Sequence, residues 1–512
     1  MPFKEVIMTD SSRDQQVSFF DNLGFKKSIA ALKKNITDLY LSFRAPWIIG
    51  YSGGKDSSTV LQLVWQSISS LPRKKLEYPI HVISTDTLVE NPVVAMWVMG
   101  SLEKMGHAAK SSNLPIHPHR LTPALEDSFW VNLIGKGYPA PRPMFRWCTS
   151  RLKINPSNKF ISDVIGQSGE AILALGMRKS ESSMRAMSMK NIEKKLGRDQ
   201  EYLSPNASMP NSYVYTPIED WSNDDVWLFL LENEKTPWGT DNSELLEFYK
   251  GATKDRECPM AITTGTPSCG DSRFGCWVCT LVSQDKSMQA LIQNDDEKDW
   301  MLPLLVYRDS FNIKEDRDRR DFRRIDGRVQ LFKDRPIHGP YWQQERRDLL
   351  RRLLEVQKLV KEKKPKDIPD FDIISIDELN EIRKIWNREK DEIEDYLPVI
   401  YEEVFGEPFP YPQFDESRIF GREELEILQD ICGDDTLHYQ LVRGLISQEQ
   451  KFRLMARRSG LFDTLEQTII KHFYENEQDA ANRELFFQER KRQLKERPQQ
   501  LKLEQFIRPV KE

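Results

Sequence analysis

The sequence predicts an α/β fold followed by a mainly helical C-terminal extension, and three observations lead to this prediction. WIIGY at residues 47–51 is typical of a short buried strand, and the SGGKDSSTVLQLVW that follows it gives a glycine turn and then an apolar helix start. Further apolar strands are indicated by YPIHVIST at residues 78–85 and by ILALG at residues 172–176. Residues 373–512 look helical and highly charged.

The composition narrows the class of protein. At 512 residues the chain is long enough for two or three domains, and its net charge of −5 gives no global positive field. No apolar run is long enough to span a membrane, and the N-terminus lacks the apolar core of a signal peptide. We therefore expect a cytoplasmic protein without a membrane partner. In that compartment the six cysteines are expected to be thiols or metal ligands rather than disulfides.

The turn after the first strand has the features of an anion-binding loop. Gly53 and Gly54 can take positive φ and let backbone N–H groups approach a ligand, while the helix that follows presents its N-terminus. Lys55 adds a positive charge suited to phosphate. The spacing differs from GxxxxGK[ST], so this is not a Walker loop. The alternative interpretation is an ordinary strand–turn–helix corner.

The string SGGKDSS resembles the PP-loop of the ATP pyrophosphatases. That resemblance implies a doubly wound, mostly parallel α/β sheet and cleavage of ATP between its α and β phosphates, with AMP transferred to an oxygen. It implies ATP and Mg²⁺ as cofactors. Lys55 and Asp56 are the residues of the loop expected to act in catalysis. The residues expected to hold the pyrophosphate end of ATP are Ser52, Gly53, Gly54, Lys55, Asp56, Ser57 and Ser58.

Three later segments narrow the resemblance to the phosphoadenosine-phosphosulfate reductase branch of that family. HVISTDT puts Asp86 beyond the carboxyl end of a strand, where ligands bind in open α/β sheets, although Asp is also a common turn cap. GMRKSESSMRA supplies Arg178 and Arg185, whose guanidinium groups can bind phosphate. YTPIEDWSNDDVWLFL resembles a third family segment, in which Ser222 is expected to cap a helix in a structural role.

Four cysteines are clustered with the spacing C-x10-C-x6-C-x2-C. A C-x2-C pair can hold one metal or cluster by local turn geometry, and two further thiolates complete a tetrathiolate site. Zinc and a [4Fe–4S] cluster both suit four thiolates, and buried thiols are the alternative. We predict a [4Fe–4S] site at Cys258, Cys269, Cys276 and Cys279.

Cys148 stands apart in PMFRWCTSRLKINP. In the assimilatory reductases a cysteine in a similar segment helps to bind a [4Fe–4S] cluster, which makes Cys148 a candidate ligand. The neighbouring Arg146, Arg151 and Lys153 would lower a thiol pKa, as expected for a catalytic sulfur carrier. We favour the carrier role, because the later segment alone can supply four ligands.

A basic stretch follows the cysteines. Residues 308–366 contain 19 Lys and Arg against 11 Asp and Glu, an excess of 8. Arginine clusters beside Tyr341 and Trp342 could contact a phosphate backbone. The alternative is a solvated helix surface of mixed charge, because acidic residues interleave throughout and RDLLRRLLEVQKLV is an amphipathic helix with Leu349 and Leu353 on its apolar side.

SCGDSRFGCWVCT and DGRVQLFKDRPIHGPYWQQERRDLL resemble the DndC-like sulfurtransferases of the Dnd DNA phosphorothioation system. The resemblance implies ATP-dependent replacement of a non-bridging oxygen of a DNA phosphodiester by sulfur. It implies DNA, a cysteine desulfurase and other Dnd components as partners. We expect an ATP pyrophosphatase domain at residues 1–250, a cysteine-rich segment at 251–300, a basic extension at 301–366 and a helical region at 367–512.

Three other functions remain open from the residues. A reductase acting on a phosphosulfate nucleotide would use the same fold without releasing pyrophosphate from ATP. A tRNA thiolase shares the PP-loop and would differ in its nucleic-acid substrate. A non-catalytic nucleotide- and cluster-binding redox sensor would bind ATP without turnover.

Overall fold

The structure is a computed structural model of the 512-residue chain, and it describes residues 18–181, 187, 203–206, 208–252, 275–412, 420–453, 455 and 457–507. The chain divides into two compact units, each built from separate stretches. The first unit comprises Met1–Pro123, Thr149–Val278 and Asp285–Asp299, and the second comprises Ala124–Cys148, Cys279–Gln284 and Trp300–Glu512. The four segment boundaries expected from the sequence stay predictions.

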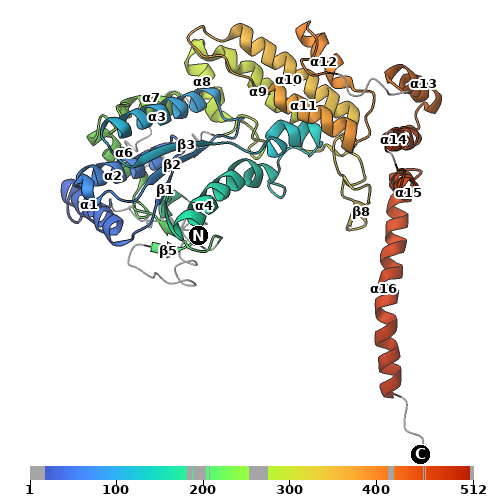
Figure 1. Ribbon diagram of the computed structural model, residues 1–512, viewed down its shortest axis with the longest axis horizontal. Coiled ribbons are helices and arrows are strands. Elements are labelled where there is room, and N and C mark those ends of the chain that lie inside the picture. Colours follow the sequence, from blue (N-terminus) through green and yellow to red (C-terminus); the bar gives the residue numbers. More distant parts are fainter. Residues whose placement is uncertain are drawn as a thin grey trace, which may run out of the picture. The chain divides into compact units, whose positions relative to one another are not determined.

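The first unit is built on a six-stranded sheet with the order β3-β2-β1-β4-β6-β5 (Figure 1). Every neighbouring pair is parallel except β5 and β6, which are antiparallel. This arrangement confirms the predicted mostly parallel α/β fold. The strands are β1 (Trp47–Gly50), β2 (Ile80–Thr85), β3 (Ile116–Leu121), β4 (Ala171–Ala174), β5 (Leu203–Pro205) and β6 (Ser212–Tyr215).

Helices cover both faces of this sheet, as in a doubly wound fold (Figure 1). Side chains alternate along β1: Trp47 and Ile49 belong to the larger core and Ile48 to the smaller one on the opposite face. Helix α4 (Asn155–Ser168) packs on the smaller core through Ile161 and Val164. The larger core takes residues from α1 (Phe25–Ser42), α2 (Lys55–Ser69), α3 (Pro92–Ser111), α6 (Asn223–Glu232) and α7 (Asn242–Gly251).

The predicted cap at Ser222 is confirmed. Ser222 precedes α6 and its hydroxyl accepts a hydrogen bond from the backbone N–H of Asp225, while the Asp225 carboxylate accepts one from Ser222 N–H. This capping box satisfies two N–H groups at the start of the helix. Asp225 also accepts hydrogen bonds from the Ser18 hydroxyl and Phe19 N–H, so the same carboxylate holds the described N-terminal end of the chain on α6.

A histidine cluster lies where β2 pairs with β3. His81 is opposite His117, and its Nδ1 lies 3.0 Å from Nε2 of His119. Burial, followed by the charges of His119 and His117, lowers the pKa of His81 to about 4, and burial lowers the pKa of His119 as well. Because an unfolded histidine titrates near about 6.5, the unfolded chain takes up more protons than the folded chain below that pH.

The stability of the chain is therefore expected to fall as the pH is lowered from about 6.5 towards about 4. His81→Gln should make that decline shallower, because it removes the most strongly shifted group. The urea midpoint measured at several pH values across this range tests the expectation. His107→Gln, at an exposed position on α3, is the matched control and should keep the wild-type pH dependence. An equal slope in His81→Gln and wild type would contradict the assignment.

The second unit is helical, which confirms the predicted helical C-terminal region. Leu349 and Leu353 lie on the buried face of α10 (Gln343–Lys363) as expected. Leu350, Leu354 and Val360 complete that face, and Val356 is half-buried. None of the helices that the structure describes is long and apolar enough to cross a bilayer. The main helices are α9 (Leu302–Phe311), α10 (Gln343–Lys363), α11 (Ile376–Lys384), α12 (Tyr396–Phe405), α13 (Arg422–Cys432), α14 (Thr436–Arg453), α15 (Leu461–His472) and α16 (Glu477–Ile507).

Two tryptophans join the early segment of the second unit to its late helices. Trp130 Nε1 donates to the carbonyl of Ile373 at 2.8 Å, and Trp386 Nε1 donates to the carbonyl of Ile134 at 3.0 Å. These contacts connect residues 243 and 252 positions apart in the chain. The π-helical turn Val131–Gly135 follows Trp130, contains Ile134 and is buried. The segment at residues 124–148 is therefore an integral part of the second unit.

Candidate nucleotide-binding site

The SGGKDSS loop lies at the topological switch point of the sheet. Strand β1 has β2 on one side and β4 on the other, and the loop connects the carboxyl end of β1 to the first turn of α2. This is the position at which open α/β sheets bind ligands. The loop after β2 starts from the same edge of the sheet, because β1 and β2 are parallel neighbours.

The two loop glycines do different things. Gly53 has a φ of +74°, and a Cβ there would lie 2.5 Å from Cγ2 of Val98, so both conformation and space require glycine. Gly54 has a φ of −84°, which corrects the expectation of positive φ at both positions. A Cβ at Gly54 would instead lie 3.2 Å from the Tyr249 hydroxyl. Glycine is therefore required at residue 53 by conformation and space, and favoured at residue 54 by space alone.

The loop serines mainly hold the loop in shape. The Ser57 hydroxyl accepts from Ser52 N–H at 3.2 Å and donates to the Gly54 carbonyl at 3.0 Å. The hydroxyls of Ser52 and Ser57 also lie 3.2 Å apart. Ser58 is buried, and its N–H donates to the Gly54 carbonyl at 3.0 Å. These contacts preorganise the turn, so that little rearrangement is required when an anion binds.

Asp56 is the centre of the charges at the start of α2. Its Oδ1 accepts from Arg178 Nε at 2.7 Å and its Oδ2 from Lys55 Nζ at 2.9 Å. Arg178 is buried and also donates to the Ser180 hydroxyl at 2.8 Å. Just before it, a Cβ at Gly176 would lie 2.8 Å from the Asp56 carbonyl carbon, so glycine allows the loop after β4 to touch the loop after β1. The structure thus brings Lys55, Asp56 and Arg178 together.

Tyr249 is a residue of this site that sequence reasoning missed. It comes from α7, its hydroxyl accepts from Lys55 N–H at 3.4 Å, and Lys55 Nζ lies 5.8 Å from its ring centre. The first N–H groups of a helix have no intrahelical partner, and here one of them bonds to a side chain. The contact joins residues 194 positions apart, and no local pattern around Tyr249 signals it.

Asp86 has the geometry of a turn residue. Its Oδ1 accepts from Leu88 N–H at 2.8 Å, and Leu88 itself has a φ of +64°. Its Oδ2 accepts from Arg120 Nε at 2.9 Å and Nη2 at 2.6 Å. These contacts account for Asp86 as a structural cap, and its predicted role in binding the cofactor stays a prediction.

One predicted metal ligand lies beside the loop after β2. Cys276 Sγ is 3.3 Å from the Thr87 hydroxyl and 3.7 Å from Glu90 Oε1. Backbone contacts fix this segment, since Trp277 N–H donates to the Val89 carbonyl at 3.1 Å. A segment that carries a predicted ligand therefore runs along the same sheet edge as the SGGKDSS loop.

The other cysteines divide between described and undescribed parts of the chain. The carbonyl of Cys279 accepts from Arg308 Nε at 3.1 Å and Nη2 at 2.6 Å, and the fully buried Arg308 is a further residue that sequence reasoning missed. Cys148 is half-buried. No group of three or more His, Cys, Asp or Glu with metal-binding geometry is found among the residues described. Two of the predicted ligands, Cys258 and Cys269, lie outside the described residues, so the four-cysteine site stays a prediction. Arg185, a predicted phosphate-binding residue, also lies outside them.

Many arginines of the basic stretch at residues 308–366 form ion pairs with carboxylates of the same stretch. Arg320 bonds to Asp316 at 2.9 Å, Arg323 to Asp321 at 2.6 Å and Arg319 to Glu345 at 3.1 Å. Tyr341 is buried, and its hydroxyl bonds to Asp316 at 3.2 Å and to Ala140 N–H at 3.1 Å. Tyr341 is thus unavailable for stacking on a nucleic acid. These contacts fit the alternative of mixed charge better than an open phosphate-binding surface.

The family comparison covers this site. Residues 46–239 match the family model of the phosphoadenosine phosphosulfate reductase domain. The matched stretch includes residues 52–58, Asp86, Cys148 and Arg178. It agrees with the reductase-branch resemblance of the motifs and with the parallel sheet, and supports an enzyme of nucleotide-dependent sulfur chemistry. The narrower resemblance to DndC-like sulfurtransferases stays a prediction.

Individual relatives are distant. An uncharacterized protein from Methanocaldococcus jannaschii is 26% identical over 203 residues, which is 40% of this chain and 35% of that protein, so the chain spans about a third of that relative's length. Phosphoadenylyl-sulfate (PAPS) reductase from Candida auris, in complex with phosphate, is 13% identical with a TM-score of 0.26, covering 43% of this chain and 91% of that one. The U34-tRNA thiolase NcsA from Methanococcus maripaludis, with its [4Fe–4S] cluster, is 15% identical with a TM-score of 0.25, covering 43% and 72%.

Proposed function

We propose that the chain is an ATP-dependent sulfurtransferase that adenylates a phosphate of the DNA backbone, releases pyrophosphate and introduces sulfur as a phosphorothioate. One observation carries the proposal. The SGGKDSS loop with Lys55 and the Cys276 segment bound to Thr87 and Val89 lie at adjacent, parallel strand ends. A phosphate-binding loop beside a cysteine segment suits a reaction that combines nucleotide activation with sulfur chemistry.

The chemistry assigned to the loop is the activation step. A phosphodiester oxygen is a poor leaving group, and attack of that oxygen on the α-phosphorus of ATP turns it into part of an AMP leaving group. Charge then accumulates on the departing pyrophosphate. Lys55 and the backbone N–H groups of the first turn of α2 would stabilise that charge, and a preorganised site does so without the cost of reorganising water.

Magnesium is expected to arrive with ATP. Both carboxylate oxygens of Asp56 already accept hydrogen bonds from cations, Lys55 and Arg178, so Asp56 does not fit a direct Mg²⁺ ligand in this arrangement. Asp56 is assigned instead to orienting Lys55.

Sulfur would come from a cysteine desulfurase as a persulfide on Cys148. The terminal sulfur of the persulfide would attack the activated phosphorus and displace AMP. A second thiol would then attack the Cys148 sulfur, forming a disulfide with Cys148 and releasing the phosphorothioate. Whether the four-cysteine site holds a cluster is a separate prediction, and no step here depends on it.

The test is a reconstitution with ATP, Mg²⁺, a DNA duplex, cysteine and a cysteine desulfurase. We expect equal amounts of AMP and pyrophosphate, and phosphorothioate linkages that mass spectrometry detects in the digested DNA. A second candidate, favoured by the family match, is reduction of a phosphosulfate nucleotide. Sulfite formed from that nucleotide, with no pyrophosphate released from ATP, would replace the proposal by this one. Thiolation of tRNA instead of DNA would identify a tRNA thiolase, and ATP binding without any turnover would indicate a non-catalytic sensor.

A further inference from the structure

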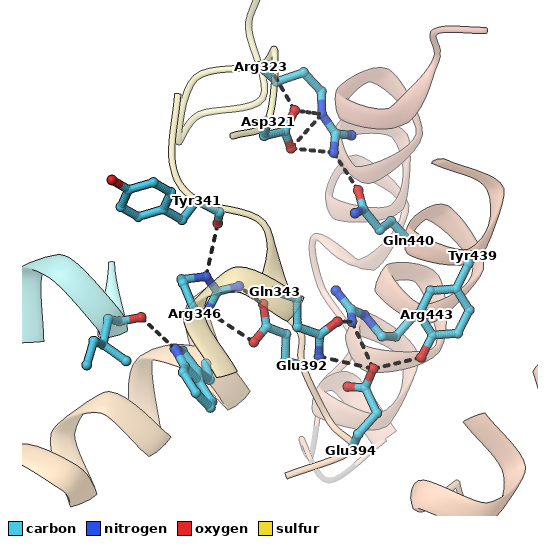
Figure 2. Close-up of polar contacts among 12 residues, drawn as sticks. Asp321, Arg323, Tyr341, Gln343, Arg346, Glu392, Glu394, Tyr439, Gln440 and Arg443 are labelled. Atoms are coloured by element: carbon cyan, nitrogen blue, oxygen red, sulfur yellow. Dashed lines mark hydrogen bonds and ion pairs between the residues drawn. The ribbon is translucent and has the colours of Figure 1, made fainter. Parts of the chain in front are cut away.

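The second unit contains a charged cavity that the proposed function does not use. It has a volume of about 140 Å³ and lies among residues 321–327, the first turn of α10, residues 389–392, α14 and the end of α15. Figure 2 shows the ion pairs around it: Asp321 and Arg323 lie on one segment, and Arg346, Glu392 and Arg443 come from three others. A cavity of this size is comparable to one that holds a benzene molecule, so it has room for a tetrahedral anion with some water.

Cations outnumber acids in the lining. Six basic side chains face four acidic ones, a formal excess of two positive charges. The basic residues are Arg323, Arg324, Arg346, Lys390, Arg443 and Lys471, and the acidic ones are Asp321, Glu389, Asp391 and Glu392. Two of the bases pair inside the lining, Arg323 with Asp321 and Arg346 with Glu392. Two further pairs with outside residues, Arg443 with Glu394 and Asp391 with Lys451, leave the excess unchanged.

Three of the lining cations stand outside these ion pairs. Within the described part of the chain, Arg324, Lys390 and Lys471 make no ion pair or side-chain hydrogen bond. Lys390 is the most constrained of them. Burial, followed by the positive charge of Arg346, lowers the pKa of Lys390 to about 7. The charges of Glu392, Asp321 and Glu389 act in the opposite direction but leave this pKa low, so a further anion would stabilise the ammonium form.

Arg443, another residue of the lining, has a buried hydrogen-bond donor without a partner. Arg443 is only 5% exposed, and its Nη1 donates to Glu394 at 2.9 Å and to Gln343 at 2.7 Å (Figure 2). Its buried Nε finds no hydrogen-bond partner among the described residues. Buried guanidinium donors are nearly always satisfied, so a group that accepts hydrogen bonds is expected there.

We propose that this cavity is a phosphate-binding site, distinct from the SGGKDSS loop and independent of the function proposed above. The excess positive charge, the unpaired Lys390 and Arg324 and the unsatisfied Arg443 Nε together suit one phosphate group with its acceptor oxygens. The phosphate could be that of a free nucleotide or that of a nucleic-acid backbone. Both present the same chemistry to the cavity, and the experiment separates them.

Binding is measured by titration calorimetry on the full-length chain carrying Lys55→Ala, which removes the side-chain cation of the SGGKDSS loop and so weakens that phosphate site. The probes are inorganic phosphate, AMP and a short DNA duplex. Lys390→Met should weaken binding by roughly tenfold to hundredfold, the value of a charge-assisted hydrogen bond. Lys361→Met is the matched control, because Lys361 is an exposed lysine of α10 paired with Asp372, and it should bind as its parent does.

If Lys390→Met binds phosphate and AMP more weakly than its parent, the cavity is a small-molecule site. If only DNA binding is weakened, the cavity contacts the nucleic-acid backbone. Either result supports the proposal. Equal binding by Lys390→Met and its parent for all three probes, or no binding by the parent, overturns it and leaves a water-filled cavity. Lys390→Met should also raise the unfolding midpoint without ligand, since it removes an unpaired ammonium. Should that variant fail to fold, Arg324→Gln is expected to show the same loss of binding.

A pH series adds an independent readout. With sulfate, whose charge does not change around neutral pH, affinity should fall as the pH rises through the pKa of Lys390, about 7. The groups facing Lys390 are Arg346, Glu392, Asp321 and Glu389, with Asp391, Arg323, Arg324, Arg443 and Lys471 also in the lining. Burial also lowers the pKa of His472, another residue of the lining. The pH dependence should vanish in Lys390→Met, and its persistence there would contradict the proposal.

Discussion

Lys55→Ala is expected to lower the rate of pyrophosphate release from ATP by about 10²–10³-fold, the usual loss when one preorganised charge-stabilising group is removed. The physical reason is that Lys55 supplies the side-chain cation of the loop, and its ammonium is held at the first turn of α2 by Asp56 at 2.9 Å. Alanine is compatible with a helix start, so the fold should be retained. The rate is measured as pyrophosphate released per chain, with DNA and the sulfur donor present.

The control for this prediction is Lys34→Ala, which removes an exposed lysine from α1 of the same unit and should leave the rate unchanged. The iron content of the protein purified without oxygen should also be the same in Lys55→Ala as in wild type, because the loop contains none of the predicted cluster ligands. Normal ATP turnover in Lys55→Ala would rule out the assignment of the loop.

Arg346→Met is expected to destabilise the second unit by about 3–5 kcal/mol, the cost of leaving one partner of a buried ion pair without compensation. Arg346 and Glu392 are both buried, and the guanidinium contacts both carboxylate oxygens while its Nε donates to the Tyr341 carbonyl at 3.1 Å (Figure 2). Methionine fills similar space but leaves the Glu392 carboxylate unpaired. The shift in urea midpoint, followed by fluorescence, measures the effect.

Arg351→Met on the same helix provides the matched comparison. Arg351 pairs with Glu403 at 2.5 Å, but both side chains are partly exposed, so its loss should cost less than about 1 kcal/mol. Arg346→Met combined with Glu392→Leu should recover much of the stability, because the unpaired charge is then gone. An equal loss of stability in Arg346→Met and Arg351→Met would show that the buried ion pair contributes no more to stability than the exposed one.

The parts of the site that could be predicted from the sequence are those encoded by local chain chemistry. The strand at residues 47–51, the glycine turn and the helix start are specified by consecutive residues, and Ser222 with Asp225 forms a cap within four residues. The apolar spacing that placed Leu349 and Leu353 in the core of the second unit is equally local.

What the sequence could not predict depends on contacts between distant residues. The Lys55 N–H bonds to the Tyr249 hydroxyl across 194 positions, and Arg308 of α9 donates to the Cys279 carbonyl across 29. The net positive charge of residues 308–366 is a further case. An excess of arginine along the chain does not show which carboxylates pair with those arginines in the folded protein. Arg346 and Glu392 are 46 residues apart, and only the folded chain shows that they neutralise each other.

The tryptophan contacts that join residues 124–148 to the late helices have a consequence for how the protein is made. During synthesis, Trp130 and Ile134 leave the ribosome long before Ile373 and Trp386 exist, because the contacts connect residues 243 and 252 positions apart. The strands of the first unit and the segment interrupting them therefore emerge together, while the partners of that segment are still untranslated. For that interval its apolar residues are exposed, which makes it a natural substrate for a chaperone that binds nascent chains.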